Sequence, residues 1–223
     1  MSAAAREAEL RRRVVDACRA MNTSGINQGT SGNISARLGD AFLITPSAVP
    51  YDELRADDLV LMTLDGAATG ERAPSTEWRI HRDVLRARPE AEAVVHAHPP
   101  FATALACLRR DIPPFHYMVA VAGGATIRCA PYATFGSQEL SDHALAALDG
   151  RRACLLANHG ILAFGSSVAS ALALAVEVEA LAGQYLRALS VGEPALLDDD
   201  EMARVVEKFR TYGRDARANQ STR

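Results

Sequence analysis

The chain carries two histidines one residue apart, His96 and His98, at the end of the apolar run 93–95. Such a run is typical of a β-strand, in which alternate side chains share a face, so we expect both imidazoles to point the same way. A third histidine, His159, follows a second apolar run and precedes Gly160. Three imidazoles with open coordination positions are typical of a catalytic metal site rather than a structural one. A His-x-His pair alone also fits ordinary core or surface histidines, so this hypothesis depends on His159.

A second group of polar residues surrounds Glu77, at the predicted start of a helix. Free backbone N–H groups and the helix dipole favour anions there, and the hydroxyls of Ser75 and Thr76 add donors, which predicts a phosphate site. A carboxylate beside such a site can act as a general base. Glu77 also fits an acidic residue that only complements the dipole. His81 shares a helix face with Glu77, and we expect it to pack or hydrogen-bond beneath the site rather than bind metal.

The polar loop 27–33 contains two glycines, Gly29 and Gly32, and can bind phosphate through backbone amides. It matches neither the Walker motif nor the dinucleotide fingerprint. Taken by itself, this segment indicates no more than a loop. Ser47 carries the same ambiguity between phosphate binding and an ordinary loop position.

Composition excludes several functional classes. The 223 residues carry a net charge of −3 and are 48% hydrophobic, which is typical of a soluble globular protein and argues against binding to nucleic acid or anionic membranes. The first 13 residues lack the apolar core of a signal peptide, and the apolar stretch 168–189 predicts a buried helix rather than a membrane span. Four scattered cysteines favour a reducing cytoplasm. The single lysine, Lys208, is expected on an exposed helix face, so Schiff-base chemistry is disfavoured.

Hydrophobic periodicity predicts one α/β domain over residues 1–213, with a largely antiparallel or mixed sheet, and a disordered polar tail over 214–223. The helix over 75–88 is expected to have Ser75 as its N-cap. Further helices are expected at 3–21, 100–108, 137–148, 168–189 and 201–210. Strands are expected at 34–38, 41–45, 59–64, 91–98, 118–122, 125–129, 153–157 and 161–164.

Motifs spread over residues 6–213 together resemble the class II aldolase/adducin family, most closely its L-fuculose-1-phosphate aldolases. Each motif is weakly specific alone, whereas the set is highly specific. They are Asn27-Gln28-Gly29-Thr30-x-Gly32-Asn33, Ile44-Thr45-Pro46-Ser47, Pro74-Ser75-Thr76-Glu77-Trp78-Arg79, Val94-Val95-His96-x-His98, His116-Tyr117-Met118, Ala130-Pro131-Tyr132-Ala133-Thr134-Phe135-Gly136, His159-Gly160 and Lys208-Phe209-x-Thr211-Tyr212-Gly213.

The resemblance implies a three-layer α/β/α fold with a mainly antiparallel central sheet. It implies one Zn²⁺ per subunit, with Co²⁺ or Mn²⁺ able to substitute, and a homotetramer with active sites at subunit contacts. The roles that it implies are metal ligation by His96, His98 and His159; acid/base catalysis by Glu77, which can also be a fourth ligand; phosphate binding by Thr30, Gly32, Asn33, Ser47, Ser75 and Thr76; proton donation to the aldehyde oxygen by Tyr117; and an aldehyde pocket formed by Phe135 and Tyr212.

The implied reaction is reversible cleavage of a ketose 1-phosphate similar to L-fuculose 1-phosphate. The products are dihydroxyacetone phosphate and an aldehyde such as lactaldehyde, formed through a metal-stabilised enediolate. Two departures from the family pattern leave the identity of the sugar substrate undetermined: Ala48 replaces a usual glycine, and Asn158 replaces a histidine.

Several alternatives share most of these residues. They are a 5-methylthioribulose-1-phosphate/5-deoxyribulose-1-phosphate aldolase, a dehydratase and a 4-epimerase. Retention of the histidines and Glu77 argues against a non-catalytic adducin-like module. The absence of a His-Glu-x-x-His motif argues against a metallohydrolase.

Overall fold

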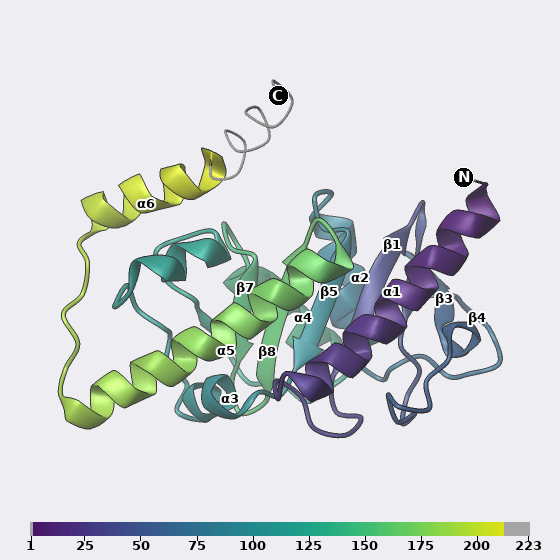
Figure 1. Cartoon of the computed structure of the whole chain (residues 1–223), viewed down its shortest axis with the longest axis horizontal. Helices are drawn as coiled ribbons and strands as arrows, with labels where there is room; N and C mark the ends of the chain where they lie inside the picture. The colour runs from purple at the N-terminus through teal and green to yellow at the C-terminus, as the bar shows by residue number, and fades with distance from the viewer. Residues whose placement is uncertain (1, 212–223) are drawn as a thin grey trace, which may run out of the picture.

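The computed structural model describes residues 2–211, and one eight-stranded sheet runs through them (Figure 1). The strand order is β4-β3-β2-β1-β5-β8-β7-β6, and neighbouring strands are antiparallel except for the parallel pair β6 and β7. The strands are β1 (Asn33–Leu38), β2 (Ala41–Ile44), β3 (Val60–Thr63), β4 (Ala68–Thr69), β5 (Ala93–Ala97), β6 (Cys129–Ala130), β7 (Ala153–Leu156) and β8 (Gly160–Gly165).

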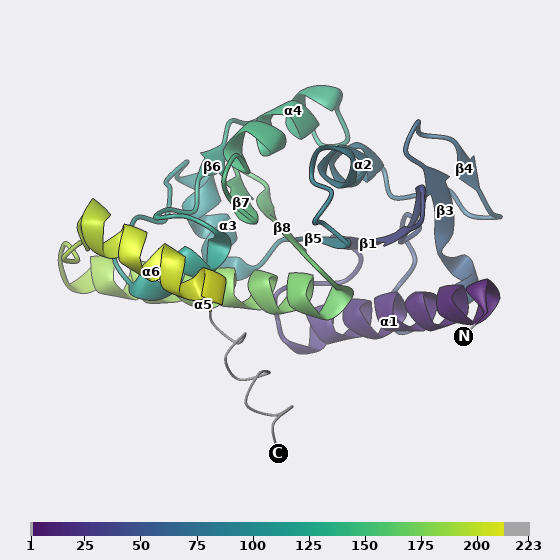
Figure 2. The same ribbon diagram turned by 90° about the horizontal axis from the view of Figure 1, so that it is seen from above.

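Helices cover both faces of this sheet, which confirms the three-layer α/β/α arrangement (Figure 2). One face packs against α1 (Ala3–Thr23), α3 (Pro100–Cys107) and α5 (Val168–Val191). The opposite face packs against α2 (Trp78–Ala87) and α4 (Gln138–Ala147). The last described helix, α6 (Asp199–Thr211), lies near the short 3₁₀ helix η2 (Tyr117–Ala122), and a second 3₁₀ helix, η1, spans Ala56–Asp58.

The central strand β5 divides its side chains between two apolar cores. Val95 and Ala97 belong to the core beneath α1, α3 and α5, whereas Val94 belongs to the core beneath α2 and α4. Alternation along the strand puts His96 on the same face as Val94. His96 therefore faces the layer that contains α2, and Glu77 is the N-cap residue of that helix.

Helix α5 is long and apolar enough to cross a membrane by composition alone. Its small and branched side chains, among them Ala171, Ala175 and Val178, are instead buried in the core against the sheet. The expectation of a buried core helix is thus confirmed.

The start of helix α2 differs from the sequence-based expectation. The helix begins at Trp78, with Glu77 rather than Ser75 as N-cap. The hydroxyl of Ser75 accepts a hydrogen bond from the backbone N–H of Glu77 at 3.3 Å, so it organises the turn that precedes the helix. Local periodicity does not fix a helix boundary to within a residue or two.

The strand expected at 118–122 is wrong, because these residues form the 3₁₀ helix η2. The His116 ring caps the helix by accepting from the Met118 N–H, and Gly123 ends it with a φ of 101°. A short apolar run does not distinguish a strand from a helical turn by itself. The strand expected at 125–129 is reduced to β6 and an isolated bridge between Ile112 and Ile127. The predicted tail over 214–223 lies outside the described residues.

The first residues of β1 approach β5 closely at Gly32. A Cβ atom on Gly32 would lie 2.6 Å from Asn27 Oδ1 and 2.7 Å from the backbone oxygen of His96. The next residue, Asn33, pairs with His96 in the antiparallel register. Gly32 therefore allows two backbone segments to meet at the position where the first histidine is held.

We predict that Gly32→Ala lowers the free energy of unfolding by about 2 kcal/mol, because the added methyl group must push apart a backbone carbonyl and a buried side chain. The control is Gly192→Ala, since Gly192 has an extended φ of 169° and nothing within 4 Å of an added Cβ. Urea unfolding of both variants provides the measurement. Equal stability of the two variants would contradict the close approach.

Candidate metal centre

Four side chains from three parts of the chain converge at one end of β5. His96 is in β5 and His98 is the first residue after that strand, whereas His159 lies in the turn between β7 and β8. Because β5 pairs with β8, with Ala97 opposite Ile161, this turn lies beside the end of β5. The ligand atoms of Glu77 and the three histidines all lie within 4.8 Å of one another.

The short distances within this cluster suit a single cation. His96 Nε2 lies 2.9 Å from His98 Nε2 and 3.1 Å from Glu77 Oε2, and His159 Nε2 lies 3.2 Å from Glu77 Oε1. Zinc bound tetrahedrally at the usual 2.0–2.1 Å separates its ligand atoms by roughly 3.3 Å. Glu77 Oε1 is buried and has no hydrogen-bond partner among the described residues. Three imidazoles and one carboxylate thus fit a divalent metal ion in their number, chemistry and separation.

The ring of His96 is fixed by its second nitrogen. Its Nδ1 lies 2.8 Å from the backbone oxygen of Ile161. A carbonyl oxygen only accepts, so Nδ1 carries the proton and Nε2 is directed at the other ligand atoms. A histidine that binds metal is usually oriented by such a bond.

Electrostatics favour an ionised carboxylate at this site. Burial raises the pKa of the Glu77 carboxyl, but the adjacent imidazoles of His96 and His159 outweigh burial and hold that pKa well below its usual range. Burial lowers the pKa of His98 to about 4, which keeps its imidazole neutral and able to bind a cation. Burial also lowers the pKa of His96, but the neighbouring Glu77 carboxylate reverses the direction and raises it. Metal and proton compete for the same atoms, so metal binding there releases protons.

A buried chain of polar side chains supports Glu77 from below. Asn33 Nδ2 donates to Glu77 Oε2 at 3.0 Å, and Asn33 Oδ1 lies within hydrogen-bond distance of His81 Nε2. His81 Nδ1 in turn lies 2.8 Å from Ser35 Oγ. Burial lowers the pKa of His81 to about 3, so the ring is neutral. His81 hydrogen-bonds beneath the site, as expected from the sequence, and Asn33 supports Glu77 in a way that the sequence did not reveal.

Three predicted phosphate-binding hydroxyls lie on neighbouring loops. The backbone N–H of Ser75 donates to Thr45 O at 3.0 Å, and Ser47 Oγ donates to Pro74 O at 2.8 Å. These bonds join the loop after β2 to the loop before α2, so Ser47 lies beside Ser75 and the exposed Thr76. Thr30 is also exposed, in the loop that leads into Gly32 and Asn33.

The predicted aldehyde-pocket residue Phe135 is exposed on a loop beside Thr76. A Cβ on the following Gly136 would lie 2.7 Å from the backbone oxygen of Thr76, and Arg79 Nη1 donates to Gly136 O at 3.0 Å. Arg79 belongs to α2, so this helix holds both the Phe135 loop and Glu77.

Tyr117 is not brought to the imidazoles within this chain. It is 51% exposed, stacks on His116, and lines a groove between η2 and α6. The other tyrosine proposed for the site, Tyr212, lies outside the described residues.

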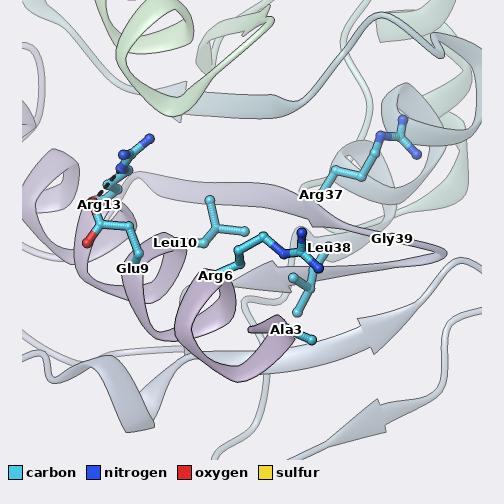
Figure 3. Close-up of a pocket in the computed structure, with 8 residues that line it drawn as sticks. All are labelled: Ala3, Arg6, Glu9, Leu10, Arg13, Arg37, Leu38 and Gly39. Atoms are coloured by element: carbon cyan, nitrogen blue, oxygen red, sulfur yellow. Dashed lines mark hydrogen bonds and ion pairs between the residues drawn. The ribbon is translucent and has the colours of Figure 1, made fainter. Parts of the chain in front are cut away.

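A different hollow, lined by arginines, lies beside the N-terminal part of α1 (Figure 3). Arg13 pairs with Glu9 there, and the guanidinium of Arg37 extends away to bond backbone oxygens of residues 85 and 91. Leu38, at its rim, is five residues along β1 from Asn33, or about 17 Å. This hollow is therefore separate from the imidazole cluster.

Two residues that depart from the family pattern have left-handed backbones. The φ angles are 59° at Ala48 and 54° at Asn158, and Arg109 shares this conformation with a φ of 54°. Arg109 was not recognised from the sequence. An asparagine directly before His-Gly is a usable signal for a left-handed turn, because asparagine tolerates positive φ better than most residues.

Comparison with known proteins supports one family. The model of the class II aldolase and adducin N-terminal domain matches residues 12–186. The chain is 56% identical over 207 residues to a 5-methylthioribulose-1-phosphate/5-deoxyribulose-1-phosphate aldolase of Rhodospirillum rubrum, covering 93% of this chain and 94% of the relative. It is 47% identical over 206 residues to the L-fuculose phosphate aldolase of Escherichia coli strain K12, covering 92% and 96%.

The fold agrees with that relationship. A solved L-fuculose 1-phosphate aldolase superposes with a TM-score of 0.88 at 40% identity, covering 91% of this chain and 96% of that structure. The family match spans most of the chain, and this chain and the solved aldolase align over nearly their full lengths. The chain belongs to the class II aldolase and adducin family.

Proposed function

We propose that this chain is a metal-dependent aldolase that cleaves 5-methylthioribulose 1-phosphate or 5-deoxyribulose 1-phosphate between C3 and C4. The products are dihydroxyacetone phosphate and methylthioacetaldehyde or acetaldehyde. The convergence of Glu77 with three imidazoles carries the proposal of an aldolase. The choice of sugar is supported by the 56% identity to the Rhodospirillum rubrum aldolase, compared with 47% to the Escherichia coli fuculose enzyme. L-Fuculose 1-phosphate, which the sequence motifs favoured, is the second candidate.

In this proposal His96, His98 and His159 hold the cation, and Zn²⁺ is the ion that the donor set favours. A divalent cation there supplies Lewis-acid stabilisation of the negative charge that develops on the ketone oxygen. Co²⁺ and Mn²⁺ accept the same nitrogen donors and can replace it.

Glu77 is proposed to move the proton at C3. In the direction of synthesis it removes a proton from C3 of dihydroxyacetone phosphate, and C3 then forms the new bond to the aldehyde carbon. In the direction of cleavage it returns a proton to C3. The carboxylate suits this role because Asn33 fixes one of its oxygens and holds it beside the imidazoles.

The hydroxyl-bearing loops are proposed to bind the phosphate. Ser47, Ser75 and Thr76 lie beside Glu77, on two loops joined by hydrogen bonds. The remaining phosphate contacts are assigned to Thr30, Gly32 and Asn33. A phosphate fixed beside the base aligns C3 with the carboxylate, so orientation is supplied before the chemical step.

Proton transfer to the aldehyde oxygen is assigned to Tyr117. Because this side chain lies away from the imidazoles of its own chain, the assignment requires that it reach a neighbouring subunit's site. The proposal therefore includes a homotetramer with active sites at subunit contacts, in which Phe135 and Tyr212 line the aldehyde pocket. We place this assembly in the cytoplasm, without nucleic-acid or membrane partners.

Loss of one imidazole should remove the metal. We expect His96→Ala to retain under about a tenth of the bound divalent metal and to lose more than about 100-fold in aldolase activity, since a ligand contributes at least as much as the groups that orient it. Elemental analysis of purified protein measures the metal. His143→Ala, on α4 and outside the cluster, is the control and should retain both. Near-normal turnover of His96→Ala would disprove the metal assignment.

Replacement of the base should separate metal binding from proton transfer. We expect Glu77→Gln to keep its metal while slowing proton exchange at C3 of dihydroxyacetone phosphate by about 10²- to 10⁴-fold, the usual range for general-base catalysis. Exchange is followed by NMR in deuterated water. The matched control is Glu90→Gln, which neutralises an exposed carboxylate paired with Arg88. Unchanged exchange in Glu77→Gln would exclude this residue as the base.

Aldehyde preference should separate the candidate substrates. With dihydroxyacetone phosphate as donor, we expect kcat/KM to be at least about 10-fold higher for methylthioacetaldehyde than for lactaldehyde, since differences of one small group in an apolar pocket have this size. A preference for lactaldehyde would assign the enzyme to L-fuculose 1-phosphate. Exchange at C3 without condensation of either aldehyde would favour the dehydratase or 4-epimerase reaction.

A further inference from the structure

The three imidazoles are held in different ways. The ring of His96 is oriented by its hydrogen bond to Ile161 O. Among residues 2–211, no comparable hydrogen bond reaches the second ring nitrogen of His159. Apart from the contact of its Nε2 with Glu77 Oε1 at 3.2 Å, the ring of His159 is oriented through its backbone, which lies in the tight turn between β7 and β8.

That turn is anchored at Asn158 by two hydrogen bonds to the end of α3. The backbone N–H of Asn158 donates to Ala106 O at 3.0 Å, and its side-chain Oδ1 accepts from Arg109 Nε at 3.0 Å. The N–H of His159 donates to Leu156 O, also at 3.0 Å, and closes the turn. Arg109 and Asn158 are both exposed, so their contact is not a by-product of core packing.

Both partners of the side-chain bond are backbone outliers. Asn158 and Arg109 each have a φ of 54°, and Ala48 is the other non-glycine residue with positive φ within the described part of the chain. A left-handed conformation costs a non-glycine residue roughly 1–2 kcal/mol and persists where surrounding contacts impose it. Two such residues joined by a hydrogen bond, one of them next to a candidate ligand, indicate a constrained turn.

Helix α3 connects this turn to the other end of the cluster. It starts directly after His98, with Pro99 as N-cap and Pro100 as its first residue. Its first two backbone N–H groups donate to the carboxylate of Glu179 on α5, at 2.9 and 2.8 Å. One short helix thus follows His98 at its N-terminus and anchors the turn before His159 at its C-terminus.

We infer that the Arg109–Asn158 hydrogen bond is a positioning device that sets His159 against His98 and thereby strengthens cation binding. Neither side chain is assigned to the substrate or to the cation itself. The inference rests on the proposed role of the imidazoles as metal ligands. Asparagine suits this position because it accepts the left-handed backbone and also supplies the oxygen that Arg109 bonds.

The test is a Co²⁺ titration of the metal-depleted full-length protein, followed by visible absorbance. Asn158→Gly permits the same backbone but deletes the amide, and Arg109→Lys keeps the charge but removes the Nε–H group. We expect each variant to weaken Co²⁺ binding by about 10-fold, the lower limit for residues that orient ligands. The double variant should bind Co²⁺ as tightly as either single variant, because each substitution removes the same hydrogen bond. Asn158→Asp, which retains an acceptor oxygen for Arg109, should bind within about twofold of wild type.

Arg152→Ala is the matched control, because Arg152 is another exposed arginine whose side chain bonds a single backbone oxygen, that of Val121. It should leave Co²⁺ affinity unchanged. Tight Co²⁺ binding by wild type, with equal affinity in Asn158→Gly and Arg109→Lys, would overturn the inference and leave the proposed function intact. Losses that multiply in the double variant would also overturn it, since the residues would then act separately. Failure of wild type to bind Co²⁺ would overturn both proposals.

Discussion

The candidate site is built around a buried carboxylate, Glu77, that faces three imidazoles. Glu77 is only 5% exposed, and an ionised carboxylate is costly to bury unless it is paired and hydrogen-bonded. Asn33 supplies one N–H group to it, and the imidazole of His96 lies 3.1 Å away. Its other oxygen lies 3.2 Å from His159 Nε2 and makes no hydrogen bond within the described structure. A divalent cation among the imidazoles would complete the compensation of this charge.

The strand order of the sheet brings Glu77, Asn33 and the three imidazoles together. β5 is flanked by β1 and β8, so its end meets Asn33 on one side and the turn carrying His159 on the other. The same alternation that sends Val95 into one core sends His96 towards the layer of α2 and Glu77. The candidate metal centre thus draws its side chains from three separate parts of the sequence, each positioned by the sheet or by helix α2, and ligand geometry needs such support.

Much of this arrangement was predictable from particular residues. The two-residue period of His96 and His98 in an apolar run fixed their common face, and His159 before a glycine indicated a turn near a strand end. The strand over 118–122 was wrong because an apolar run bounded by prolines and glycines fits either a strand or a 3₁₀ helix. Local sequence patterns could not predict hydrogen bonds between residues far apart in the sequence, such as those of Asn33 with Glu77 and Arg109 with Asn158. The position of Tyr117 in the groove between η2 and α6 was equally hidden, because local sequence patterns do not show which distant elements a helix packs against.

X-ray absorption spectroscopy of the zinc-loaded protein can establish whether three imidazoles bind one cation. We expect only nitrogen and oxygen neighbours at about 2.0–2.1 Å from the zinc, with the multiple-scattering pattern of three imidazole rings. The same pattern should lose one ring in His159→Ala. A sulfur neighbour at about 2.3 Å, or a zinc environment with fewer than three imidazoles in the unmodified protein, would rule out the site of three imidazoles.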